Sequence, residues 1–223
     1  MTKKLFILLV GFISIFSFLS IGLFFPNESD APVLKEKGCV VLNYHRVRPN
    51  DSLLNLVEDM TSLYTKDREI EDYSVHTDAF EKQMKELKKQ QVTFLTPKDL
   101  AKAMYNNKPL PDKCAIVTFD DADVTTYQYA YPILKQYDIP FTVFVITGQM
   151  GSDQFHGLKM MTWEQLNEMV DSGLVTVGSH TYNMHYLLNN KKPPFLYPEY
   201  QQQFKKDIEK ANADFRKHLG YKL

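Results

Sequence analysis

Two short polar motifs hold the side chains best suited to chemistry. Asp120 and Asp121 follow the apolar run 115–117, and His180 and His185 follow a similar β-branched run. Such runs are typical of buried β-strands, so the four side chains should lie just beyond the carboxyl ends of two strands, where α/β proteins carry their active sites. One carboxylate and two imidazoles can bind a catalytic divalent metal and leave a coordination position open. The second carboxylate would then be free to act as a base.

The spacing within each motif restricts how these side chains can meet. His180 and His185 are five residues apart, which places them on different faces of a helix and on opposite faces of a strand. They can bind one ion only if the chain curls between them, which Tyr182 and Asn183 would allow. Neighbouring aspartates likewise converge only where a strand turns into its loop. Either motif alone has an ordinary explanation, as a helix cap or as surface histidines, but their conjunction at equivalent strand ends predicts a metal site.

The length and charge of the chain fit one domain with a substantial core. The chain has 223 residues and a formal net charge of -1. This balance gives no electrostatic footprint for nucleic acid and none for an anionic substrate. We therefore expect no nucleic-acid partner.

The N-terminus predicts a targeting or anchoring segment. Lys3 and Lys4 precede the uncharged, mostly apolar stretch Leu5–Phe25. This stretch is longer than the roughly 7–15 residues of the apolar core of a secretory signal peptide and close to the length of a spanning helix. We expect residues 1–25 to form an uncleaved signal anchor, with a long cleaved signal peptide as the alternative, and residues 26–38 to form a linker. The lysines should stay in the cytoplasm, which places the rest of the chain outside it, membrane-anchored or secreted at the cell surface.

Strand and helix patterns alternate through most of the remaining chain. Predicted strands cover residues 40–44, 92–95, 115–119, 141–146 and 175–177. Predicted helices cover residues 77–90, 97–105, 127–137, 163–171 and 199–219. This alternation is typical of a parallel sheet with helical crossovers, either open or closed as a barrel. No strand pattern follows the last helix, so we expect the domain over 39–223 to be incomplete at its C-terminus.

The two cysteines leave two interpretations open. Cys39 and Cys114 each lie six residues before a candidate site residue, His45 and Asp120 respectively. If their strands are parallel neighbours, the two thiols would lie at the same level of the sheet. An extracytoplasmic location permits a disulfide. Because connectivity cannot be read from sequence, two buried free thiols is the preferred interpretation.

The motifs as a whole resemble those of a known family. Residues 118–121, Thr-Phe-Asp-Asp, and residues 179–185, Ser-His-Thr-Tyr-Asn-Met-His, resemble the first two signature motifs of the polysaccharide deacetylases, the NodB-homology or carbohydrate esterase family 4 group. Residues 41–47, Val-Leu-Asn-Tyr-His-Arg-Val, resemble most the branch that deacetylates poly-β-1,6-N-acetylglucosamine in biofilms. The resemblance runs from about Cys39 to the end of the chain.

The resemblance implies a fold and a role for each motif residue. The fold of that family is a distorted (β/α)₇ barrel. By the resemblance, Asp120 is the catalytic base, whereas Asp121, His180 and His185 hold the metal, and His45 lines the substrate pocket. Oxygen and imidazole ligands suit zinc best, and also cobalt, nickel or iron.

Aromatic side chains beside these motifs are candidates for sugar contacts. Tyr44 and Tyr182 could stack on sugar rings, and core packing is the ordinary alternative for both. The chain departs from the family pattern in three places. The spacing between His180 and His185 is one residue longer than is common in the family, as in the biofilm branch. Ala122 stands where the family often has glycine, and the third motif is not found, because residues 195–198 lie in a predicted loop rather than on a strand.

The sequence therefore predicts a metal-dependent hydrolase that removes N-acetyl groups from the N-acetylglucosamine residues of an extracellular polysaccharide, poly-β-1,6-N-acetylglucosamine. Its partners would be that acetylated polysaccharide and, through the N-terminal segment, a membrane. One alternative keeps the chemistry and changes the substrate to peptidoglycan or chitin oligomers. The other is a truncated, non-catalytic glycan-binding relative, because the later family motifs would fall beyond Leu223.

Overall fold

The computed structural model describes residues 38–50 and 73–221. The predicted anchor over 1–25 and nearly all of the predicted linker over 26–38 lie outside the described residues. Within the described ranges, none of the helices combines the length and the apolar character that crossing a bilayer requires.

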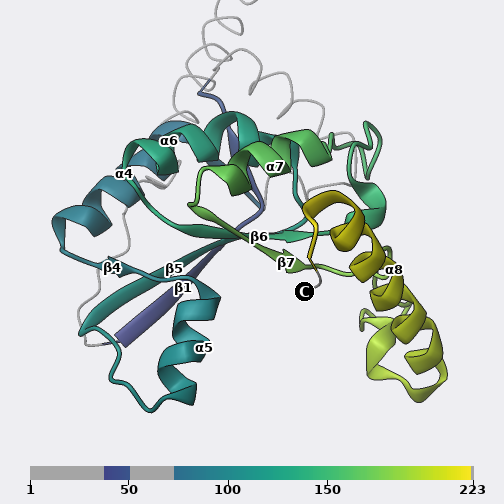
Figure 1. Ribbon diagram of the computed structural model, residues 1–223. Coiled ribbons are helices and arrows are strands. Elements are labelled where there is room, and N and C mark those ends of the chain that lie inside the picture. The colour runs from purple at the N-terminus through teal and green to yellow at the C-terminus, as the bar shows by residue number, and fades with distance from the viewer. Residues whose placement is uncertain (1–37, 51–72, 222–223) are drawn as a thin grey trace, which may run out of the picture. The chain divides into compact units, whose positions relative to one another are not determined.

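The main sheet consists of five strands, and every pairing in it is parallel (Figure 1). Its path runs through four strands in this order: β1 (Gly38–Tyr44), β5 (Lys113–Phe119), β6 (Phe141–Val145) and β7 (Val175–Ser179). The two-residue strand β4 (Thr93–Phe94) pairs with the first half of β5. Because β1 and β7 stand at opposite ends of this order, the described strands form an open sheet, as in a partial and distorted (β/α) barrel. The predicted parallel α/β class is confirmed.

A second, small sheet lies where the sequence predicted no strand. It consists of β2 (Arg46–Arg48) and β3 (Ser74–His76), which pair in parallel. β2 begins two residues after β1 ends, so the chain changes sheet at His45.

Helices cover one face of the main sheet. This layer contains α4 (Thr77–Lys89), α6 (Tyr131–Gln136) and α7 (Trp163–Asp171) (Figure 1). Their apolar side chains pack on the sheet, and Phe80, Met84 and Leu87 of α4 are fully buried at helical spacing. Alternation along β5 turns Val117 and Phe119 into the same core. Two further helices are α5 (Pro97–Tyr105) and α8 (Gln201–Leu219), and α8 lies beyond β7 (Figure 1).

The predicted starts of α5 and α7 are confirmed, whereas α4 follows His76 without a side-chain cap and α8 begins at Gln201, after a short 3-10 turn. Thr96 and Thr162 each form a capping box, in which the threonine hydroxyl accepts a hydrogen bond from the third helical N–H. The helix predicted over 127–137 begins instead as a π-helix, Thr126–Ala130, and continues as α6. Pro132 lies at this junction and has no N–H to donate, so an ordinary α-helical ladder cannot run through it.

The preferred interpretation of two free thiols is wrong. Cys39 and Cys114 are register partners on the neighbouring strands β1 and β5, and a disulfide joins them. Their Cα atoms lie 4.3 Å apart. The sequence indicated that the two thiols would lie at one level if their strands were neighbours. It could not show that the strands are neighbours, and this adjacency decides the pairing.

Candidate metal centre and active site

The candidate side chains meet because several strands end at one edge of the sheet. The last residues of β1 and β5, Tyr44 and Phe119, are register partners. The next strand, β6, is in register with β7 up to Ser179, the last residue of β7. His45, Asp120 and His180 follow directly on three of these strands, so the parallel register delivers all three to the same edge.

Asp121, His180 and His185 form a cluster that fits a metal ion. One candidate ligand atom from each of the three lies within 4.8 Å of the others. Asp121 Oδ1 lies 3.5 Å from His180 Nε2 and 3.7 Å from His185 Nε2. Both separations are too long for hydrogen bonds, but they match two ligands that share one ion through bonds of about 2 Å.

The carboxylate of Asp121 supports the same assignment. The residue is 8% exposed, and its buried Oδ1 has no hydrogen-bond partner. A buried acceptor without a partner is costly, so an oxygen that faces two imidazole nitrogens is explained well by a cation between them. The oxygen and the two nitrogens are a donor set that zinc and similar ions accept.

Burial also favours the metal-binding form of His180. Desolvation, followed by the neighbouring His185, lowers the pKa of His180 below its ordinary value. The imidazole therefore stays neutral to lower pH than an exposed histidine would. Neutral imidazole is the form that binds metal ions.

A left-handed turn after β5 lets two adjacent aspartates serve one site. Asp121 has a φ of 71° and Ala122 a φ of 69°. The Ala122 N–H donates to the carbonyl of Asp120 at 2.9 Å, and the Ala122 carbonyl accepts from the N–H of Met161. Residues with a Cβ adopt this conformation at a cost of roughly 1–2 kcal/mol each, so the surrounding structure must hold the turn. The predicted turn at the end of this strand is confirmed.

The curl between the two histidines is also confirmed, although its position differs from the prediction. The left-handed residue is Thr181, with a φ of 73°, rather than Tyr182 or Asn183. The Thr181 hydroxyl accepts a hydrogen bond from the N–H of Met184, which closes the curl. The ring centroids of His180 and His185 consequently lie 4.4 Å apart.

Asp120 lies beside this cluster and has partners of its own. Its Oδ2 accepts a hydrogen bond from Asn43 Nδ2 at 2.9 Å and lies 3.8 Å from His45 Nε2. The Thr118 hydroxyl donates to Asn43 Oδ1 at 2.7 Å, and this bond orients the amide so that its NH₂ faces Asp120. The ring of His45 lies against that of Tyr73, with centroids 4.8 Å apart.

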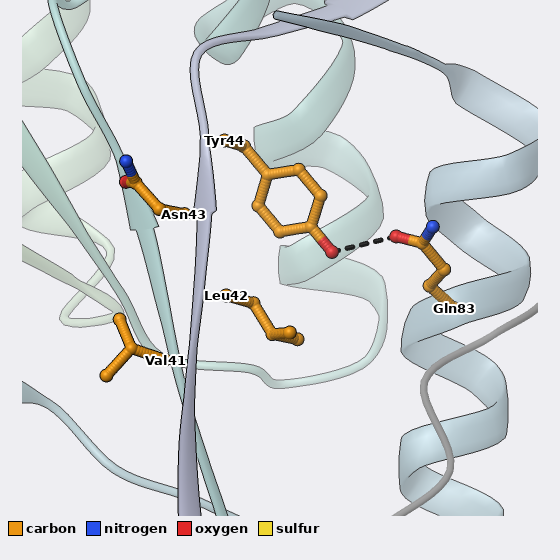
Figure 2. Close-up of a pocket in the computed structure, with 5 residues that line it drawn as sticks. All are labelled: Val41, Leu42, Asn43, Tyr44 and Gln83. Atoms are coloured by element: carbon orange, nitrogen blue, oxygen red, sulfur yellow. Dashed lines mark hydrogen bonds between the residues drawn. The ribbon is translucent and has the colours of Figure 1, made fainter.

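Tyr44 is not brought into the cluster. Its side chain points to the helix side of β1, together with Leu42, whereas Asn43 and Val41 point the other way (Figure 2). The Tyr44 hydroxyl donates to Gln83 Oε1 at 2.8 Å, and burial raises the pKa of this phenol, which keeps it a donor. The ring also packs on two phenylalanines of the core.

Tyr182 lies in the histidine loop, the segment 181–184 between the two histidines, and its ring is contacted from α8. The ammonium group of Lys210 lies 5.2 Å from the centre of the Tyr182 ring. The Tyr182 carbonyl accepts from the N–H of Gly148. The proposed sugar contacts of Tyr44 and Tyr182 stay predictions.

Comparison with known proteins supplies the family. Residues 107–223 match the family described as polysaccharide deacetylase, which is just over half of the chain. A poly-β-1,6-N-acetyl-D-glucosamine N-deacetylase of Staphylococcus aureus (strain MRSA252) is 35% identical over 222 residues, which cover 97% of this chain and 74% of that protein. The chain belongs to the polysaccharide deacetylase family. A Staphylococcus epidermidis protein with the same name is 38% identical over 193 residues, which cover 86% of this chain but only 65% of the relative.

Solved structures of this family share the fold. IcaB from Ammonifex degensii superposes with a TM-score of 0.70 at 38% identity, covering 86% of this chain and 73% of that chain. The Streptococcus pyogenes deacetylase PplD, solved with acetate, has a TM-score of 0.63 at 24% identity and covers 84% of this chain and 72% of its own. The second likeness concerns the fold alone.

The candidate site contains one polar side chain, Asn43, that the sequence motifs did not indicate as a site residue. Asn43 contacts the predicted base, and no local signal indicates this contact, because it depends on the pairing of β1 with β5, in which Asn43 and Thr118 are register partners. The reading of residues 195–198 as a loop is confirmed, because two short 3-10 turns, Pro194–Leu196 and Pro198–Tyr200, occupy this stretch.

Proposed function

We propose that this protein is a metal-dependent N-deacetylase that hydrolyses the acetamide groups of N-acetylglucosamine residues in an extracellular polysaccharide. The polysaccharide named for the relatives in both staphylococci, poly-β-1,6-N-acetyl-D-glucosamine, is the substrate we assign. The reaction adds water across the amide bond and yields acetate and a free glucosamine amine. Each turnover therefore adds a cationic group to the polymer.

One observation carries the proposal. A carboxylate that the metal cluster does not need, Asp120, lies directly beside that cluster, and Asn43 and His45 both approach its Oδ2. A site that only bound a metal would not need this residue. A metal site with an adjacent proton acceptor is what amide hydrolysis requires.

The residues divide the chemistry between them. Asp121, His180 and His185 would hold a divalent ion, which supplies positive charge that polarises the acetyl carbonyl and acidifies water. Asp120 accepts the proton from the attacking water. Because both described contacts fall on its Oδ2, Oδ1 is the oxygen left to receive that proton. His45, beside Asp120 at the same edge, is placed to contact the sugar.

We assign zinc as the ion, with cobalt, nickel or iron as substitutes, from the one carboxylate and two imidazoles of the cluster. We also propose that the domain works outside the cytoplasm, anchored to a membrane or secreted. The Cys39–Cys114 disulfide supports this location, because structural disulfides persist mainly in oxidising compartments.

The test is acetate release from oligomers of poly-β-1,6-N-acetylglucosamine by the purified protein with added zinc or cobalt. We expect release by the unaltered protein, a rate lower by a factor of roughly 100 or more in Asp120→Asn, and no release by His180→Ala. Asp120→Asn should still bind metal, whereas His180→Ala should lose it, because only the second change removes a ligand. His156→Asn is the matched control, since His156 is an exposed histidine outside the cluster with a φ of 50°, which asparagine tolerates.

Parallel assays on chitin oligomers and peptidoglycan fragments address the substrate. Release from these polymers alone would replace the assigned substrate and keep the chemistry. Stoichiometric metal binding without acetate release from any of the three polymers would refute the enzymatic proposal and favour a glycan-binding protein.

A further inference from the structure

Helix α8 carries a buried carboxylate on its apolar face. Asp207 is 7% exposed and shares the inward face of the helix with Ala211 and Phe215, at a spacing of four residues. A charged group on such a face is costly unless polar groups satisfy it. The hydrogen-bond partners of Asp207 therefore indicate the role of this carboxylate.

Those partners are two consecutive backbone groups of the histidine loop. The N–H of Tyr182 donates to Asp207 Oδ2 at 2.7 Å, and the N–H of Asn183 donates to Oδ1 at 2.8 Å. Both bonds are short and charge-assisted, which makes them stronger than neutral hydrogen bonds. The two peptide groups lie between His180 and His185, so Asp207 binds the backbone of the segment that separates the two candidate ligands.

The same segment is also held by the short 3-10 turn Thr147–Gln149, which follows β6. The N–H of Thr147 donates to the carbonyl of Thr181 at 3.2 Å, and the N–H of Gly148 donates to the carbonyl of Tyr182 at 3.0 Å. The side chain of Gln149 donates to that of Asn183 at 2.6 Å. The curl is therefore held between this turn and α8, and Asp207 supplies both of the described hydrogen bonds on the α8 side.

We propose that Asp207 is a positioning residue for the metal centre. It holds the segment 181–184 in the curled form that points His180 and His185 at one ion, and it preorganises the two imidazoles before metal binds. The inference rests on the proposed metal-binding function of the cluster. It assigns to α8, which contributes no ligand, a direct part in the affinity of the site.

The first test is a titration of the intact protein with Zn²⁺ in competition with a chromophoric chelator. We expect Asp207→Ala to weaken zinc binding about 10- to 100-fold, the usual effect of losing a partner that orients metal ligands. Asp207→Asn should weaken it less, because the amide keeps one acceptor oxygen but presents an NH₂ group to the second N–H.

Two variants of the same helix serve as controls. Glu209→Gln removes an exposed negative charge two residues away. Ala211→Gly weakens the helix at a buried position one turn from Asp207 and leaves the carboxylate in place. Both should keep the zinc affinity of the unaltered protein. An equal loss of affinity in Ala211→Gly would assign the effect to helix stability and overturn the proposal.

The second test is hydrogen exchange at the amides of Tyr182 and Asn183 in the protein without added metal. Exchange should accelerate in Asp207→Asn and stay unchanged in Glu209→Gln. If Asp207→Ala does not fold, Asp207→Asn decides alone: unaltered zinc affinity or unaltered exchange in this folded variant overturns the proposal. If the unaltered protein binds no zinc but exchange depends on Asp207, the proposed metal function fails while the positioning of the loop by Asp207 stands.

Discussion

Substitution of Asn43 by alanine should slow deacetylation without affecting metal binding. The substitution removes the hydrogen bond from Asn43 Nδ2 to Asp120 Oδ2, which is 2.9 Å long. Hydrogen bonds to charged groups contribute about 1.5–3 kcal/mol, and this one belongs at the lower end because the Asp120 side chain is 18% exposed and water can replace part of the bond. The bond also fixes the orientation of the carboxylate, and if about 1–2 kcal/mol of that orientation is lost, kcat/KM decreases roughly 5- to 30-fold.

The assay is the rate of acetate release, measured for Asn43→Ala, Asp120→Asn and the double variant. If Asn43 acts through Asp120, the double variant should be no slower than Asp120→Asn alone, because the second change removes a bond whose partner has already been altered. Fully additive losses would refute the reasoning, and so would an Asn43→Ala variant with unaltered kcat/KM.

Thr118 provides a matched pair of variants for the same argument. Its hydroxyl orients the amide of Asn43 through a bond of 2.7 Å. Thr118→Val removes this hydroxyl with little change in shape and should lower kcat/KM in the same direction as Asn43→Ala. Thr118→Ser keeps the hydroxyl and should restore most of the activity. Equal rates for the two variants would show that the orientation of the amide has no influence on the base.

Two further substitutions distinguish the effect of the histidine loop on zinc binding from the effect of the core on stability. Gly148→Ala would place its Cβ 2.7 Å from both the Tyr182 carbonyl oxygen and Asn183 Oδ1. We expect a loss of roughly 1–3 kcal/mol in unfolding free energy, measured with denaturant, and weaker zinc binding in the competition titration. An unaltered zinc affinity would contradict this prediction. Tyr44→Phe removes the hydrogen bond to Gln83. It should lower the unfolding free energy by about 1 kcal/mol and leave kcat/KM unchanged. A selective rise in KM would instead favour a sugar contact for Tyr44.

The fold and the main site residues could be predicted because their signals are local. Apolar β-branched runs alternate with amphipathic segments, and this alternation requires parallel strands with helical crossovers. Parallel strands present their carboxyl ends at one edge, so polar residues directly after two runs were expected to meet. Asp121, His180 and His185 do meet there. The meeting of these side chains could be predicted from their positions at strand ends, without knowledge of the rest of the molecule.

Contacts between distant segments could not be predicted in the same way. The sequence allowed a disulfide between Cys39 and Cys114 but could not decide it, because pairing depends on which strands are neighbours. Tyr44 resembled a site residue by its place beside His45, yet strand alternation turns it to the helix side of the sheet. Sequence proximity to a motif does not fix the face on which a side chain lies.

The amino-acid sequence thus indicated the chemistry that we propose for this protein, because the residue types able to bind a metal and to accept a proton occur at the ends of recognisable strands. Only the tertiary structure decided how that chemistry is held in place. Asn43 reaches Asp120 from a strand 77 positions away, and Asp207 holds the histidine loop from a helix that follows it by 24 and 25 positions. No local pattern encodes such contacts, since they exist only when packing brings the two segments together.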